Sequence, residues 1–176
     1  LLERPLSEML ASGRPNFPFC VSWANENWTR RWDGREQEIL LKQEYSTEAD
    51  RAFIGELFSV FSDRRYIRVN GKPLLLVYRT ESLPNCKKTA DLWREESIRA
   101  GIGDLYLCRV ESFSAVNPES IGFDAACQFP PLLIYAPELN PALVFNGADP
   151  SVFQGKMFDY PGLARQALNA KADYKR

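Results

Sequence analysis

The feature that most constrains the fold is an alternation of short apolar runs with segments of helical periodicity. In segment 47–61 the apolar residues have the spacing of one helix face, and segment 87–100 is expected to be a helix that ends at Gly101 and Gly103. Strands that are joined by helices run parallel and are buried on both faces, so this order predicts an α/β fold. Four apolar runs have the length and composition of buried strands: 17–22, 73–78, 105–110 and 123–129.

Local signals place the ends of the helices. Gly13 is expected to close a helix over 4–12, and Thr47 followed three residues later by Asp50 predicts an N-cap at Thr47 for the next helix. A polar helix is expected over 160–176. The segment between the first strand and the second helix is long and rich in tryptophan, which predicts a long aromatic loop.

Two architectures fit this order, a doubly wound open sheet and part of a (β/α)8 barrel. No G-x-G-x-x-G or G-x-x-x-x-G-K-[ST] motif follows any apolar run, so the usual nucleotide cradle of an open sheet is not visible. A full barrel needs ~250 residues. The 176 residues are therefore expected to form one domain over 1–176, an internal fragment of a larger barrel whose open strand edges could pair with a second copy.

Charge and composition exclude several functions. Lys and Arg number 22 against 23 Asp and Glu, which argues against a nucleic-acid binder and against attraction to an anionic membrane. The apolar runs are far shorter than the ~20 residues that span a bilayer. The absence of histidine removes Ser-His-Asp chemistry and His-ligated zinc from this chain. We expect no metal and no cofactor, and any acid–base work must fall to carboxylates, Tyr, Lys or Cys.

The cysteines indicate a reducing compartment. No two have C-x-x-C spacing, and three lie in or beside apolar runs, so small buried side chains are favoured over disulfides. A cytoplasmic location is the expectation that follows. The chain starts at Leu1 with no signal peptide, and the true N-terminus is expected to lie upstream. The four cysteines are Cys20, Cys86, Cys108 and Cys127.

Polar side chains follow each apolar run. In a barrel of parallel strands, ligands bind at the carboxyl ends of the strands, which is where these side chains are expected. The second run ends at Arg79, the third at Glu111 and the fourth at Gln128. The block after the first run is the richest in aromatic and polar groups. Aromatic rings stack on sugar rings, while amides, carboxylates and guanidinium groups bind hydroxyls. The candidate sugar-binding residues of this block are Trp23, Asn25, Asn27, Trp28, Arg30, Arg31, Trp32 and Asp33.

A structural interpretation of this block is equally consistent with the residues: a loop held by buried tryptophans, with Arg–Asp pairs on its surface. Phosphate binding by Arg30 and Arg31 is a third, weaker interpretation. Glu26 is the best-placed acid, because burial beside tryptophans could make it a general acid or base. The alternative for Glu26 is an ion pair with Arg30 or Arg31. Arg79 is favoured as a structural partner over a substrate clamp, and Glu111 is either a ligand-binding or a loop carboxylate.

Four blocks of the sequence resemble a known family. They are F-C-V-S-W-A-N-E-N-W-T-R-R-W-D-G at 19–34, D-R-R-Y-I-R-V-N-G-K-P-L-L-L-V-Y-R at 63–79, G-F-D-A-A at 122–126 and F-P-P at 129–131. The chain resembles the WbsX-type glycosyltransferase domain, also described as glycoside hydrolase family 99-like, over most of 1–135. The resemblance implies a (β/α)8 barrel related to endo-acting α-mannosidases. It also implies an oligosaccharide or polysaccharide substrate in bacterial polysaccharide, lipopolysaccharide and O-antigen biosynthesis.

Two departures from the family bear on the site. The family's E-F-P-P-H block reads Q-F-P-P-L at 128–132, and its N-E-W-x-E-G block with two catalytic glutamates does not occur. Glu26 would then be a substrate-binding or supporting acid. The leading hypothesis is a domain that acts on glycosidic bonds by transfer or hydrolysis. The rivals are a glycan-binding module without catalysis and a degenerate fragment that lacks the glutamate pair.

Overall fold

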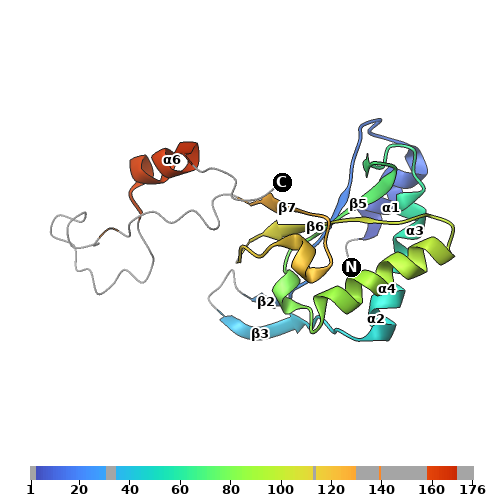
Figure 1. Cartoon of the computed structure of the whole chain (residues 1–176), viewed down its shortest axis with the longest axis horizontal. Coiled ribbons are helices and arrows are strands. Elements are labelled where there is room, and N and C mark those ends of the chain that lie inside the picture. The colour runs from blue at the N-terminus through green and yellow to red at the C-terminus, as the bar shows by residue number, and fades with distance from the viewer. Residues whose placement is uncertain (1–2, 31–34, 113, 130–138, 140–157, 170–176) are drawn as a thin grey trace.

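A four-stranded parallel sheet organises the computed structural model, which describes residues 3–30, 35–112, 114–129, 139 and 158–169 (Figure 1). The strand order is β1-β5-β6-β7, and β4 (Arg68–Val69) pairs antiparallel with β5. The predicted α/β class is confirmed, and within the described ranges the sheet stays open and does not close into a barrel. The parallel strands are β1 (Val21–Trp23), β5 (Lys72–Val77), β6 (Tyr106–Glu111) and β7 (Ala125–Gln128).

Helices follow the first two strands of this sheet along the chain, as the sequence predicts for parallel connections. None of the helices in the described ranges is both long and apolar enough to cross a membrane. The helical segments are α1 (Glu3–Ser12), α2 (Thr47–Glu56), α3 (Phe58–Phe61), η2 (Thr80–Ser82), α4 (Cys86–Arg99), η3 (Pro118–Ile121) and α6 (Tyr160–Asn169).

The core lies between one face of the sheet and the helices α2, α3 and α4. Leu75 and Val77 alternate along β5 and are fully buried, and they share one cluster with Ile54 of α2 and Trp93 of α4. Each such side chain contributes roughly 1.5–3 kcal/mol on burial. This cluster fixes the positions of the strand ends from which the candidate site is built.

Two local predictions are wrong in position. The first strand begins at Val21, later than the predicted run, and the residues before it make only an isolated bridge between Phe19 and Tyr66. The N-cap of α2 is Ser46, whose hydroxyl accepts a hydrogen bond from the backbone N–H of Ala49. A serine one residue earlier has the extended backbone that a cap requires, so Thr47 becomes the first helical residue.

The predicted long aromatic loop is in part a β-hairpin. β2 (Trp28–Arg30) pairs antiparallel with β3 (Arg35–Leu41), with irregular register. The Asn27 side-chain oxygen accepts a hydrogen bond from the backbone N–H of Gln43 at 2.8 Å. Pairing within the hairpin satisfies backbone groups that a long irregular loop would leave without partners.

All four cysteines are free thiols; Cys108 is buried, as predicted, and the other three are half-buried. Cys108 and Cys127 lie on neighbouring strands β6 and β7 and interact with each other. A hydrogen bond from Cys108 lowers the pKa of the Cys127 thiol to about 7. The same contact, together with burial, raises the pKa of Cys108.

Candidate functional site

The carboxyl ends of β1 and β5 are joined by a single buried amide side chain. The Asn25 Nδ2 donates to the Arg79 carbonyl at 2.8 Å, and the Asn25 Oδ1 accepts from the Arg79 N–H at 2.8 Å. This pair of bonds continues the strand pairing, in which the Tyr78 N–H donates to the Trp23 carbonyl. Asn25 is 0% exposed. Its amide therefore fixes the Arg79 backbone instead of facing solvent.

Two hydroxyl groups that the sequence analysis did not single out complete this arrangement. The Tyr45 hydroxyl donates to the Asn25 carbonyl at 2.6 Å, and burial raises the pKa of Tyr45. The Ser112 hydroxyl donates to the Tyr78 carbonyl at 2.7 Å and so joins the ends of β6 and β5. Neither residue lies in a recognisable motif, because each is defined by a contact distant in sequence.

The fixed position of Arg79 brings its side chain to Glu26. Arg79 Nη1 lies 3.0 Å from Glu26 Oε2, and Arg79 Nε lies 3.5 Å from Glu81 Oε1. The Arg79 and Glu26 side chains are 31% and 35% exposed, so a ligand could reach both. The alternative interpretation of Glu26 is an ion pair with Arg30 or Arg31. The observed partner is 53 residues away in the sequence and comes from the end of the neighbouring strand.

A cavity of about 350 Å³ opens at this ion pair. That volume falls within the range typical of small-molecule sites. Its lining consists of polar groups and one aromatic ring, which suits a polyhydroxylated ligand. The lining residues are Glu26, Asn27, Thr29, Lys42, Gln43, Tyr45, Arg79 and Ser82.

The two described tryptophans of the aromatic block have different surroundings. Trp23 stacks on Phe53 with ring centroids 4.2 Å apart and meets Trp93 edge-on, so its ring belongs to the core. The structural interpretation is therefore the one that the geometry favours for Trp23. Trp28 lies on β2 opposite Leu41 and is 43% exposed, which leaves ring surface available to a ligand.

The remaining candidates lie apart from the cavity lining or outside the described residues. Arg30 contacts Glu38 across the hairpin at 3.3 Å. Arg31, Trp32 and Asp33 fall outside the described ranges. Glu111 is buried and is the register partner of the exposed Gln128, at the carboxyl ends of β6 and β7.

A buried arginine that the sequence analysis also missed shapes the loop after β6. Arg109 is fully buried, and its guanidinium donates to the Val116 and Ser114 carbonyls at 2.8 Å each. An arginine in an apolar strand is the signal that could have identified it, because a buried charge requires partners. Within the described ranges, no cluster of three or more acidic or thiol groups could hold a metal ion.

The chain is an α/β domain with a polar, ion-paired cavity at the carboxyl ends of its strands, which is where open α/β sheets bind their ligands. The family model "Glycosyltransferase WbsX" matches residues 1–176, and the chain belongs to this family. Two curated relatives, both "Uncharacterized protein WxcX" from strains of Xanthomonas campestris pv. campestris, are 41% and 40% identical to it over 165 residues. The alignment covers 94% of this chain and 23% of each relative, so the chain spans about a quarter of their length. No solved structure matches the chain significantly.

Proposed function

We propose that this chain supplies a glycan-binding wall in an enzyme that acts on glycosidic bonds in bacterial surface polysaccharide metabolism, by transfer or by hydrolysis. The observation that carries the proposal is the Glu26–Arg79 ion pair at the mouth of the polar cavity. Membership in the WbsX glycosyltransferase family supports a carbohydrate ligand over other polar molecules.

The ion pair offers both kinds of hydrogen-bonding group to a sugar. The Glu26 carboxylate accepts from hydroxyl groups, and the Arg79 guanidinium donates to hydroxyl or ring oxygens. Because Asn25 holds the Arg79 backbone, the two side chains keep a fixed separation, which lowers the entropic cost of binding. Trp28 provides an exposed ring on the adjoining hairpin for stacking.

Cleavage of a glycosidic bond usually requires two carboxyl groups that flank it. Among the described residues that line the cavity, Glu26 is the single carboxylate. Glu26 is therefore assigned to substrate binding and support of the reaction, with the second carboxyl group supplied from outside this cavity. The single carboxylate in this lining is also what the alternative function expects, which is a glycan-binding module without catalysis or a degenerate fragment.

The test replaces Glu26 by glutamine, which removes the charge and keeps the shape. Affinity is measured on an array of bacterial polysaccharides, and release or transfer of sugar is measured on the glycans that bind. Glu26→Gln should lower affinity or turnover at least tenfold, which corresponds to about 1.4 kcal/mol. Glu38→Gln is the matched control, because it makes the same charge change in an exposed ion pair on the hairpin.

The possible results separate the candidate functions. A tenfold loss with Glu26→Gln and none with Glu38→Gln supports the site. Glycan binding without any bond cleavage or transfer supports the binding module. Unchanged affinity and turnover in Glu26→Gln would remove Glu26 from the site.

A further inference from the structure

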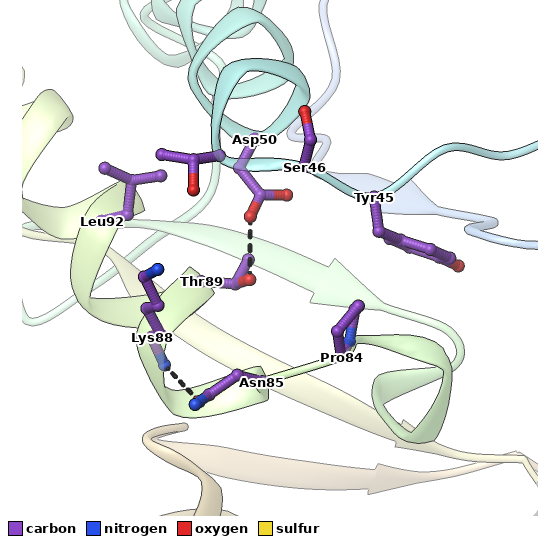
Figure 2. Close-up of a pocket in the computed structure, with 9 residues that line it drawn as sticks. Tyr45, Ser46, Asp50, Pro84, Asn85, Lys88, Thr89 and Leu92 are labelled. Atoms are coloured by element: carbon purple, nitrogen blue, oxygen red, sulfur yellow. Dashed lines mark hydrogen bonds between the residues drawn. The ribbon is translucent and has the colours of Figure 1, made fainter.

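A second, smaller cavity adjoins the candidate site. It has a volume of about 160 Å³ and lies between the N-terminal ends of α2 and α4 (Figure 2). Tyr45 lines both this cavity and the one at Glu26, so the two share a wall. At roughly 30 Å³ for each water of the liquid, the smaller cavity has the volume of about five waters. It therefore has room for one small ring and not for a chain.

The sequence forms this cavity by capping two helices side by side. Ser46 caps α2, and Asn85 caps α4 by accepting a hydrogen bond from the Lys88 N–H at 3.0 Å. The caps fix the two helix ends, and α2 and α4 are tied together just below them. The Thr89 hydroxyl donates to Asp50 Oδ2 at 2.9 Å, and the Trp93 indole donates to the Asp50 carbonyl at 3.1 Å.

Asp50 is the side chain that points to a ligand. It is only 9% exposed, and burial raises its pKa. One carboxylate oxygen bonds Thr89, while the other turns toward the side of the cavity where Ser46 and Tyr45 lie (Figure 2). Within the described ranges, this second oxygen has no hydrogen-bond donor. This oxygen is open to the cavity, so a hydroxyl group that enters the cavity can donate a hydrogen bond to it.

The charges around the cavity select a neutral ligand. Two helix N-termini and Lys88 attract negative charge, but the buried Asp50 carboxylate opposes an anion at the same place. A cation that suits Asp50 would in turn meet Lys88 and the positive helix ends. A neutral molecule with hydroxyl groups donates to Asp50 and accepts from Lys88 without either conflict.

The other walls of the cavity suit the carbon face of a sugar ring. Pro84 and Leu92 give apolar surface to the cavity, and Tyr45 borders it with its hydroxyl directed away from Asp50 and Thr89 (Figure 2). We propose that this cavity is a second sugar subsite, which holds one hexose-sized ring of the glycan beside the ring bound at Glu26 and Arg79. Asp50 accepts from a hydroxyl of that ring and Lys88 donates to another. The substrate class in this inference rests on the proposed function above.

The test uses two variants that separate binding from helix packing. Asp50→Asn keeps an acceptor for Thr89 but can turn an NH₂ group, a donor, toward the cavity. Thr89→Val removes the bond between the helices and leaves the carboxylate in place. The probes are D-glucose, D-mannose, D-galactose and L-rhamnose, each titrated into the ¹⁵N-labelled chain, with inorganic phosphate as a separate titration. Backbone amide shifts at Ser46 and Lys88 report occupancy, and a thermal melt of each variant reports folding.

The proposal expects at least one hexose to shift these amides, with affinity reduced at least tenfold by Asp50→Asn and less than threefold by Thr89→Val. If no sugar shifts them, or if Asp50→Asn binds sugar as tightly as the parent, the proposal is overturned. Shifts with phosphate alone that strengthen in Asp50→Asn also overturn it, because they define an anion site. Glu26→Gln should leave the hexose shifts at Ser46 and Lys88 in place. A failure at Glu26 is therefore distinguishable from a failure at Asp50.

Discussion

Replacing Asn25 by alanine tests the central structural claim, that one amide holds the ends of β1 and β5 together. The substitution removes both hydrogen bonds to the Arg79 peptide group and leaves its N–H and C=O buried without those partners. Each bond contributes about 1 kcal/mol net, and each buried group left without a partner adds a desolvation cost. We therefore expect Asn25→Ala to lower the free energy of unfolding by about 2–4 kcal/mol.

Urea unfolding measures this loss, since the midpoint should fall while the slope with denaturant stays constant. For a chain of this size, about 3 kcal/mol corresponds to a decrease in Tm of roughly 6–12 °C. Asn25→Asp provides a second variant, because a carboxylate accepts from the Arg79 N–H but cannot donate to the Arg79 carbonyl. It should lose a comparable amount, with added repulsion from Glu26 close by.

Asn27→Ala is the matched control, because Asn27 is exposed and makes one bond, to the Gln43 N–H. It should cost about 1 kcal/mol or less. If Asn25→Ala unfolds within about 1 kcal/mol of the parent, or no more easily than Asn27→Ala, the amide does not hold the strand ends and the reasoning fails.

Two further predictions follow from the pKa shifts. The Arg65 guanidinium hydrogen-bonds Asp63 and lowers its pKa to about 2 from 3.8. The stability that this pair contributes is therefore present above about pH 4 and is lost as the pH falls toward 2. Asp63→Asn should therefore make Tm fall less steeply with decreasing pH in this range. An unchanged dependence of Tm on pH would contradict this. Iodoacetamide should modify Cys127 with a midpoint near pH 7, and Cys108→Ala should move that midpoint up by at least about one unit, as followed by peptide mass spectrometry. An unmoved midpoint would show that Cys108 is not the cause.

The sequence predicts the strands of the sheet well where the core determines them. β5 and β6 begin and end within one residue of the predicted runs, because their buried residues give each strand a mainly apolar segment. The first strand is less well predicted. Its predicted run includes Phe17, which is exposed, and apolar residues at a strand entrance look the same in sequence as residues within the strand.

The partner of Glu26 shows that a local sequence pattern does not predict contacts between residues far apart in the chain. Arg30 and Arg31 are near in sequence, so an ion pair of Glu26 with one of them is the alternative that the local pattern offers. The register of β1 against β5 instead pairs Trp23 with Val77, which brings the residues after each strand, Glu26 and Arg79, to the same place. Register is set by the packing of the whole sheet on its helices, and neighbouring residues do not encode it.

The tryptophans show the same limit at the level of one side chain. Trp23 and Trp28 belong to one dense aromatic block, and their residue type alone predicts the same role. Trp23 follows Val21 with the two-residue period of a strand and faces the helices, where Phe53 and Trp93 receive it. Trp28 lies beyond the strand, on the hairpin, and keeps exposed surface.

Within the described part of this block, the Trp23 ring and the Asn25 amide therefore position one ion pair. The Trp23 ring anchors the end of β1 in the core, and the Asn25 amide then fixes the Arg79 backbone. These two contacts place the Glu26 and Arg79 side chains next to each other at the cavity. A sugar-binding role distributed evenly over the block would predict similar binding losses for every substitution in it. The structure instead predicts that substitutions at 23 and 25 act first on stability, whereas those at Glu26 and Arg79 act first on glycan affinity.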